Sequence, residues 1–135
     1  MIALDTSIVV AAFGSWHENH ALAVSRLRHD AALTAHTALE AYSVLTRLPE
    51  PFRADPGVVA EFLRQTFPRA SLTLSPAAQR ALPGQLSRLG ITGGRAYDAL
   101  IALTARAAGA RLLTLDARAL ATYASCEVEA ELIVD

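Results

Sequence analysis

The sequence contains no lysine, so all 12 of its positively charged side chains are arginines. Chemistry that depends on a lysine amine is thereby excluded: Schiff-base formation with a carbonyl substrate, a nucleotide-binding phosphate loop, and a lysine-assisted phosphoacceptor site. The formal net charge of −1 neither requires nor excludes a nucleic-acid partner, because arginines can still gather into a local patch on a nearly neutral protein.

Cysteine is almost absent, since Cys126 is the single one. A disulfide framework and a cysteine-based metal cluster are therefore excluded, which fits a reducing cytoplasm. The N-terminus lacks the basic stretch, apolar run and cleavage site of a signal peptide. No apolar run approaches the roughly 20 residues that a membrane-spanning helix needs. We therefore expect a soluble, cytoplasmic protein without membrane association.

What the sequence does contain is typical of a folded α/β protein. Its 135 residues are 53% hydrophobic and 19% charged, which predicts one globular domain over 1–135. Short apolar runs predict strands at 1–4, 31–35, 71–74, 111–115 and, as an edge strand, 128–134. Helices are predicted at 6–13, 17–28, 37–48, 55–67 and from 76 onward. A long helix is predicted after Gly93-Gly94 to about Ala108, ended by Gly109, and a short one after the strand at 111–115. Strands separated by helices in this way predict a mainly parallel sheet covered on both faces, a three-layer α/β/α sandwich.

Four acidic residues lie within apolar sequence at the ends of these predicted elements: Asp5, Glu40, Asp98 and Asp116. Carboxylates are costly to bury unless they are paired, hydrogen-bonded or bound to a cation. Asp5 and Asp116 directly follow strands, and the other two fall in the first turns of helices. Ligands of an open parallel sheet bind outside the carboxyl ends of its strands, so we expect the four acids to converge there. Hard oxygen ligands of this kind favour Mg²⁺, with Mn²⁺ as a substitute.

Three of these acids also have a structural interpretation. Asp5 could simply cap the helix that begins at Thr6, although we favour the functional role. Asp116 has the same alternative for the helix that follows it, and its position alone does not decide between the two. Glu40 forms a capping box with Thr37, and that role does not exclude a functional one.

Asp98 is harder to explain as a structural residue. On a helix it shares a face with Ile101, Ala102 and Ala105, which are apolar and small. A surface aspartate would lie on the opposite face. Its first-turn position also lets the helix dipole stabilise the anion. We therefore interpret Asp98 as a functional residue.

Three further residues are candidates for supporting roles. Thr114 points to the same side as Asp116 and could bond a metal-bound water, or it reflects ordinary strand propensity. Ser7 could act in the same way from a first helical turn, or merely cap the helix. Arg95 could orient Asp98 or contact a phosphate, or it could be a solvated side chain.

Some side chains depend on the fold for their interpretation. His17 and His20 indicate surface residues rather than zinc ligands, because no further histidine or cysteine lies near them. His36 is close to Glu40 in sequence but cannot be placed. A basic stripe would have to draw on Arg88, Arg95, Arg106, Arg111 and Arg118. The apolar side chains Val58, Val59, Phe62 and Leu63 exceed what a core of this size needs, which predicts an interface.

Three segments give the sequence a family resemblance: IALDTSIVVAAF, ALTAHTALEAYSVL and GGRAYDALIALTARAAGARLLTLDARAL. In order and spacing they resemble a PIN-domain protein of the VapC toxin kind, over nearly the whole chain. The family's acidic set maps onto Asp5, Glu40, Asp98 and Asp116, and its small polar residue onto Thr114. The helices in 55–88 match the family only in pattern.

The resemblance implies a Mg²⁺- or Mn²⁺-dependent endoribonuclease that acts as the toxin of a type II toxin–antitoxin system. It also implies a small antitoxin partner and a homodimer or a toxin–antitoxin hetero-oligomer. Asp5, Asp98 and Asp116 would hold the metal directly or through water, and Glu40 would be a further ligand or would orient the attacking water. Cleavage by water leaves 5′-phosphate and 3′-hydroxyl ends.

Two alternatives are weighed against this function. A haloacid-dehalogenase-like phosphatase would need a second aspartate where Ser7 stands. A catalytically inert PIN-like module that only binds RNA or protein is the main competitor. Four gathered carboxylates argue against it, because they would repel RNA phosphates without a metal.

Overall fold

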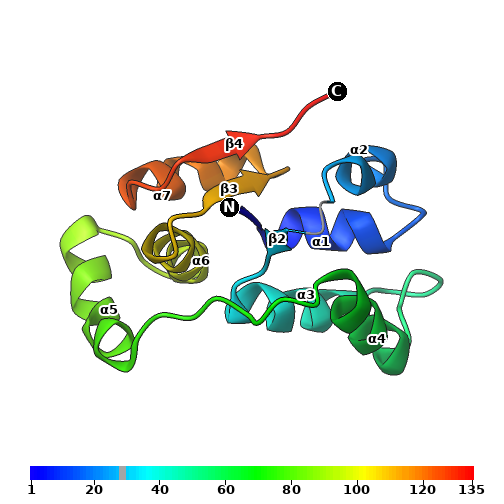
Figure 1. Ribbon diagram of the computed structural model, residues 1–135, viewed down its shortest axis with the longest axis horizontal. Coiled ribbons are helices and arrows are strands. Elements are labelled where there is room, and N and C mark those ends of the chain that lie inside the picture. Colours follow the sequence, from blue (N-terminus) through cyan, green and yellow to red (C-terminus); the bar gives the residue numbers. More distant parts are fainter. Residues whose placement is uncertain (28–29) are drawn as a thin grey trace.

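The computed structural model describes residues 1–27 and 30–135, and it contains a sheet of four parallel strands (Figure 1). The strands are β1 (Ile2–Leu4), β2 (Ala31–Ala32), β3 (Arg111–Thr114) and β4 (Ala130–Leu132). Their order across the sheet is β2-β1-β3-β4. The chain therefore winds outward from β1 in one direction first and then in the other. This reversal creates a switch point between β1 and β3, where α/β sheets bind ligands at the carboxyl ends of the strands.

Helices connect these strands and form the outer layers. They are α1 (Thr6–Phe13), α2 (His20–Ser25), α3 (Ala35–Thr46), α4 (Pro56–Thr66), α5 (Pro76–Leu89), α6 (Arg95–Ala107) and α7 (Leu120–Ser125), with a 3₁₀ turn η1 (Ala117–Ala119) before α7. None of the helices in the described ranges is long and apolar enough to cross a membrane.

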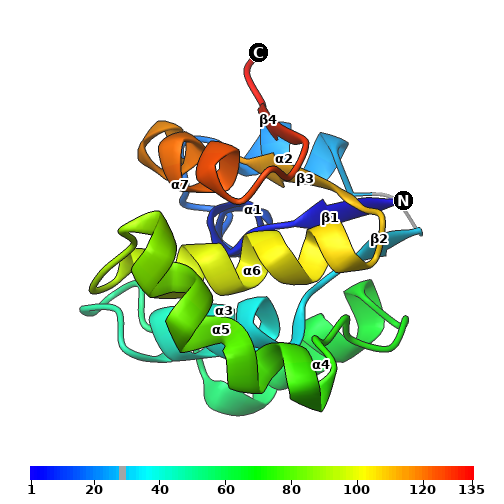
Figure 2. The same ribbon diagram turned by 90° about the vertical axis from the view of Figure 1, so that its left-hand side faces the viewer.

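The alternation of side chains along the strands builds two separate cores. Ala3 and Leu112 are fully buried on one face of the sheet, against residues of α6 and α7. Their neighbours Leu4 and Leu113 are buried on the other face, against residues of α1 and α2. Figure 2 shows α6 running along the sheet with α5 outside it. The three-layer α/β/α sandwich predicted from the sequence is thus confirmed.

Some predicted boundaries were wrong. Residues 71–74 form no strand of the sheet, because Leu72 makes only an isolated bridge with Thr34 before Ser75 caps α5. The helix predicted at 17–28 begins only at His20 and ends at Ser25, and position 28 lies outside the described residues. The last strand is shorter than 128–134, although it does lie at the sheet edge.

The apolar face of α4 lies partly in the core and partly on the surface. Val59 is completely buried. Phe62 meets Phe13 and Phe67 edge to face, with ring centroids 5.2 Å and 6.2 Å apart. Only Val58 is clearly exposed, at 56%. Phe62 and Leu63 are only partly buried, so the interface inferred from this face stays a prediction.

Candidate functional site

A pocket of about 210 Å³ opens at the switch point, and we call it the acid pocket. Its lining consists of Asp5, Thr6, Ser7, Glu40, Asp98, Ile101, Asp116 and Tyr123. The structure thus brings all four predicted acids to one place, as the strand order requires. They come from four separate parts of the chain: the ends of β1 and β3 and the helices α3 and α6.

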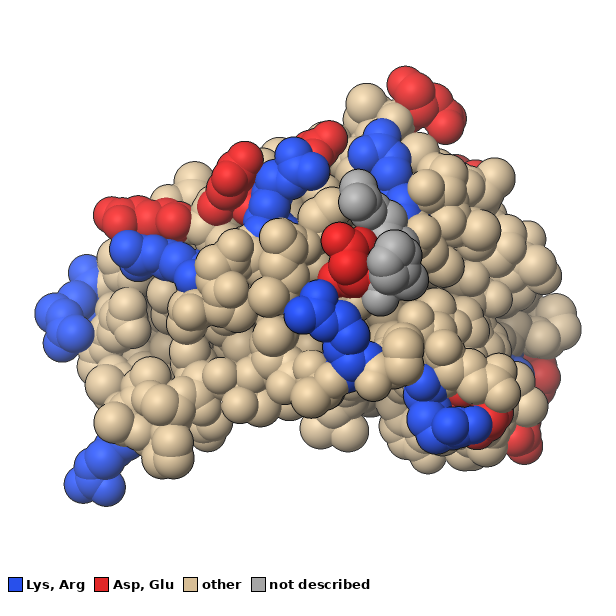
Figure 3. Space-filling view, in the orientation of Figure 1, with Lys and Arg blue, Asp and Glu red and all other residues tan. Residues whose placement is uncertain are grey.

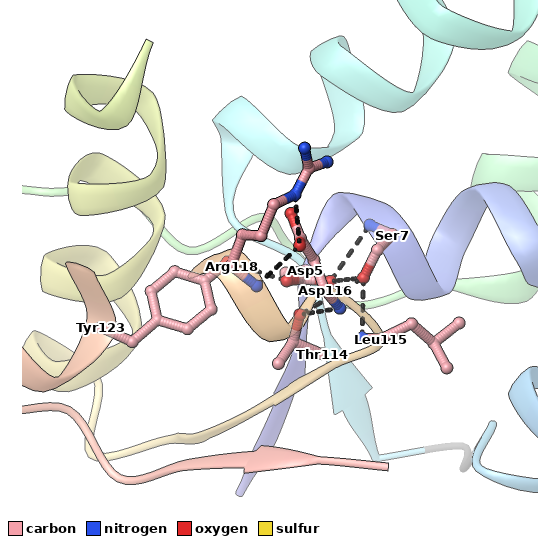
Figure 4. A network of polar contacts seen from close by, with 7 residues as sticks. All are labelled: Asp5, Ser7, Thr114, Leu115, Asp116, Arg118 and Tyr123. Carbon is pink, nitrogen blue, oxygen red and sulfur yellow. Dashed lines mark hydrogen bonds and ion pairs between the residues drawn. The ribbon is translucent and has the colours of Figure 1, made fainter. Parts of the chain in front are cut away.

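Asp5 is the buried floor of the acid pocket, at 3% exposure. Its Oδ1 accepts hydrogen bonds from the backbone N–H of Ser7, at 3.1 Å, and from the Ser7 hydroxyl. Its Oδ2 accepts a bond of 2.8 Å from the hydroxyl of Tyr123 (Figure 4). The residue therefore caps α1, as its structural interpretation required, and also faces the pocket.

Burial and hydrogen bonding shift the pKa of Asp5 in opposite directions. Burial raises the pKa of the Asp5 carboxyl, because the charged form loses its water. The hydrogen bonds from Ser7, Thr114 and Tyr123 oppose that rise. A buried carboxylate held by several donors is preorganised, since its orientation no longer depends on solvent.

Ser7 and Thr114 join the ends of β1 and β3 behind Asp5. The Ser7 hydroxyl donates to Asp5 and accepts a bond of 2.9 Å from the backbone N–H of Leu115. The Thr114 hydroxyl accepts from the backbone N–H of Asp116 at 2.9 Å and lies 3.4 Å from the Ser7 hydroxyl. Thr114 is completely buried. Its hydroxyl therefore holds both the backbone of Asp116 and the carboxylate of Asp5, and the predicted bond to a metal-bound water stays a prediction.

Glu40 lies in the second turn of α3, not in the first turn as predicted. The helix begins at Ala35, and its cap is Thr34, which accepts a bond of 3.0 Å from the backbone N–H of Thr37. The predicted capping box of Thr37 and Glu40 was therefore wrong. The side chain of Glu40 points across to α1 instead, where the Thr6 hydroxyl donates to its Oε1. On the other side, Nε2 of His36 lies 3.4 Å from its Oε2.

Asp98 lies in the first turn of α6, as predicted, and accepts no hydrogen bond from any residue in the described ranges. Its pKa is raised to about 6, chiefly by partial burial and then by the negative charges of Glu40, Asp5 and Asp116. The four acids therefore interact electrostatically. Arg95 is exposed at the start of α6 and forms no ion pair with Asp98, so the suggested orienting role is not seen.

Asp116 combines a structural role with a place on the acid pocket. It caps η1 by accepting a bond of 3.0 Å from the backbone N–H of Arg118. The Arg118 side chain lies 3.5 Å away but is 95% exposed. Such a solvated pair contributes little free energy and leaves the carboxylate available to another cation.

The four carboxylates line one pocket, but their side chains are not close enough together to bind an ion in the arrangement seen. Within the part of the chain that the structure describes, no three His, Cys, Asp or Glu side chains are close enough together to hold an ion. Each carboxylate can accept about four hydrogen bonds or metal contacts, so the hydrogen bonds described above leave oxygen lone pairs free for a metal. The donor set is all oxygen and negatively charged, which fits a hard divalent cation.

The arginines do not form the stripe that the sequence allowed. Arg95 and Arg106 belong to the first and last turns of α6, a separation of roughly 16 Å along the helix. Arg106 pairs with Glu127 at 3.4 Å and Arg111 with Glu131 at 3.3 Å. Figure 3 likewise shows arginine and acidic side chains side by side on one face of the molecule.

The first histidine pair also has local roles. Nδ1 of His17 accepts a bond of 3.0 Å from the backbone N–H of Asn19. Nδ1 of His20 lies 2.8 Å from the carbonyl oxygen of Ala11. Both side chains are half-buried rather than exposed as predicted, and each has a local partner.

Two residues of the acid pocket escaped the sequence analysis. The sequence marked Thr6 only as the start of a helix, although its position directly after Asp5 could have drawn attention to its hydroxyl. Tyr123 bonds to Asp5 across 118 positions of sequence. Nothing local in the sequence distinguishes it from a core tyrosine.

Comparisons with known proteins agree with this arrangement. The model of the PIN domain family matches residues 2–125 of the chain. Ribonuclease VapC40 of Mycobacterium tuberculosis is 48% identical over 133 residues, which cover 98% of this chain and 99% of that protein. Ribonuclease VapC27 of the same organism is 44% identical over 123 residues, covering 90% of this chain and 89% of that one.

Solved structures share the fold. The crystal structure of FitAcB from Neisseria gonorrhoeae has a TM-score of 0.68 at 22% identity, with 96% of each chain covered. The structure of FitAB bound to an IR36 DNA fragment has a TM-score of 0.70 at 19% identity, with 100% of this chain and 98% of that chain covered. At these identities the likeness concerns the fold alone.

Proposed function

This chain belongs to the PIN domain family and is a ribonuclease toxin of the VapC type, and we propose that it hydrolyses RNA with a divalent metal held at the acid pocket. The observation that carries the proposal is the meeting of four acids from four separate elements at the switch point. The pKa of Asp98 is raised partly by the charges of the other three. A bound cation cancels the repulsion between these carboxylates, so the folded protein is stabilised when the cation binds.

We assign the metal ligands from the positions of the acids. Asp5, Asp98 and Asp116 are the proposed ligands of Mg²⁺, with Mn²⁺ as a substitute, directly or through water. Glu40 is either a further ligand or the group that orients the attacking water. When bound, such an ion neutralises negative charge on the phosphoryl group, lowers the pKa of a bound water and stabilises the leaving oxygen.

The residues around these acids act by holding them in place. Ser7 and Tyr123 together engage both oxygens of Asp5. Thr6 and His36 flank the two oxygens of Glu40 in the same way. Side chains that orient carboxylates at a metal site affect metal affinity and activity, so these contacts support the assignment.

Supporting roles are proposed for two of the remaining candidates. Thr114 fixes the backbone from which Asp116 projects. Arg95 is exposed near the pocket, at the start of the helix that carries Asp98, and a phosphate of the RNA would be its partner. Neither residue needs to contact the metal for these roles.

The proposed partners are RNA as substrate, a small cognate antitoxin, and a second copy of the chain or a toxin–antitoxin hetero-oligomer. The VapC relatives support the antitoxin, and a toxin that cuts cellular RNA acts in the cytoplasm. Light scattering at tens of micromolar tests the homodimer, because a stable interface forms dimers at that concentration. A monomer there contradicts it.

Sequencing of RNA ends after brief expression tests the function in cells. The native chain should produce new 5′-phosphate ends at a restricted set of sites, whereas Asp98→Asn should produce none above background. The carboxamide is nearly the shape of the carboxylate but carries no charge, so the comparison isolates the charge. Identical RNA ends from both proteins would contradict the assignment of Asp98. Native expression without new ends would instead support an inert binding module.

A further inference from the structure

A pair of stacked rings lies close to Glu40, and of the two residues only His36 has been given a role above. The rings of His36 on α3 and Tyr97 on α6 are nearly parallel, with an interplanar angle of 5° and centroids 5.2 Å apart. Tyr97 directly precedes Asp98 in the first turn of α6. His36 lies one helical turn before Glu40, and its Nε2 is 3.4 Å from that carboxylate. The pair therefore joins the two helices that carry these acids.

Tyr97 is largely exposed to solvent, so packing in the core does not account for its aromatic ring. It is 55% exposed, while Tyr123 is 1% exposed. His36 covers one face of its ring, so much of the remaining ring surface faces solvent. His36 contacts both the ring of Tyr97 and the carboxylate of Glu40, so it links that ring to an acid of the pocket. Tyr97 itself borders a neighbouring groove that Leu82 and Leu86 of α5 also line.

We propose that Tyr97, backed by His36, is a stacking platform for an unpaired base of the RNA next to the phosphate that is cut. This inference rests on the proposed function and assigns to Tyr97 a contact with the RNA substrate. A flat, exposed ring that His36 links to Glu40 of the acid pocket suits the planar face of a base, and the sugar–phosphate linkage of that base would extend toward the acids.

The physics of stacking limits which RNA can use this platform. Bases inside a duplex are already stacked on their neighbours, so a protein ring reaches them only in single strands, loops or bulges. Stacking tolerates any base, because every base has a π-face. The platform therefore places the chain on unpaired RNA without choosing the sequence, which other contacts must do.

Binding to a defined probe tests the platform. The probe is a fluorescein-labelled single-stranded RNA of 12 mixed nucleotides, with its fully paired duplex for comparison, at fixed salt because phosphate contacts depend on salt. The full chain carries Asp98→Asn throughout, so that the probe is not cut, and Mg²⁺ is present at millimolar concentration. Adding Tyr97→Leu removes the ring but keeps apolar bulk. It should weaken binding of the single strand roughly 5- to 100-fold.

Two matched variants complete the design. Tyr97→Phe keeps the ring and should bind within about twofold of the parent, since stacking needs no hydroxyl. Phe52→Ala removes another exposed aromatic, which lies against Trp16 away from the acid pocket, and should also bind within about twofold. Melting temperatures of all variants establish that they are folded before binding is compared.

The outcomes separate this inference from the proposed function. If folded Tyr97→Leu binds the single strand as well as the parent, or if the duplex binds the parent as well as the single strand does, the platform is wrong even where cleavage needs metal. If native protein cuts no RNA but Tyr97→Leu still loses binding that Tyr97→Phe retains, the platform stands and the catalytic proposal fails.

Discussion

The hydroxyl of Tyr123 donates a hydrogen bond of 2.8 Å to Oδ2 of Asp5, linking α7 to the end of β1 across 118 positions of sequence. Burial and the charge of Asp5 raise the pKa of Tyr123 far above its ordinary value, so this hydroxyl is a donor at every physiological pH. Ser7 occupies the other oxygen of Asp5. The most buried acid of the pocket is therefore held by the fold itself, and its orientation should affect stability as well as activity.

Tyr123→Phe should destabilise the protein by about 1–3 kcal/mol at neutral pH. The variant keeps the ring but leaves one oxygen of buried Asp5 without its protein donor, and unsatisfied buried acceptors cost that much. Urea unfolding measures the change. Tyr97→Phe is the control, because Tyr97 is an exposed tyrosine and should change stability by less than about 0.5 kcal/mol. Equal stabilities of the two variants would mean that the Tyr123–Asp5 bond contributes nothing.

Thr6→Val should slow RNA cleavage while lowering the stability of the protein only slightly. The variant preserves the branched shape but removes the hydroxyl that donates to Oε1 of Glu40. Loss of a residue that orients such a ligand typically reduces activity about 10- to 100-fold. Thr46→Val is the matched control, since its hydroxyl bonds only to carbonyls of its own helix. If both valine variants cut RNA at the native rate, Thr6 has no positioning role.

Asp98→Asn should stabilise the metal-free protein at neutral pH but not in acid. The pKa of Asp98 is raised to about 6 in the folded protein, against about 3.9 in an unfolded chain. Between these values the folded state binds more protons, so the native protein loses stability as pH rises from about 4 to about 6. The asparagine variant has no such loss. The difference in melting temperature in EDTA should therefore appear above about pH 4 and level off above about pH 6.

Added metal provides the second half of the same experiment. A ligand that binds only the folded state stabilises it by mass action. Millimolar Mn²⁺ should therefore raise the melting temperature of the native chain and raise that of Asp98→Asn by less. If the variant melts well below the native chain in EDTA at neutral pH, Asp98 is a structural anchor and does not belong to a set of repelling acids.

The helix starts and the convergence of the four acids could be predicted from the sequence, because both follow from local chemistry. The sequence predicted helices that begin at positions 6, 55 and 76, and the structure places helix starts at Thr6, Pro56 and Pro76. The convergence of the acids followed from their positions at strand ends and helix starts, because a parallel sheet brings those ends to one edge.

The errors arose where tertiary contacts decide the outcome. At the start of α3 both Thr34 and Thr37 were suitable caps, and Thr34 was selected because residues 33–35 continue alongside Leu72 after β2 ends. The helix therefore begins two residues earlier than predicted, which places Glu40 in its second turn. Contacts between residues distant in sequence, such as that of Tyr123 with Asp5, cannot be predicted from local sequence patterns.

Cleavage of a defined RNA by the purified chain, with Mn²⁺ or with EDTA, tests the central claim most directly. With metal, the native protein should cut the RNA and leave 5′-phosphate and 3′-hydroxyl ends, and Asp5→Asn or Asp98→Asn should abolish cleavage while circular dichroism stays native. EDTA should stop the native protein as completely as either substitution does. Equal cleavage in EDTA, or ends that carry a 2′,3′-cyclic phosphate, would contradict a metal-dependent hydrolysis at the four acids.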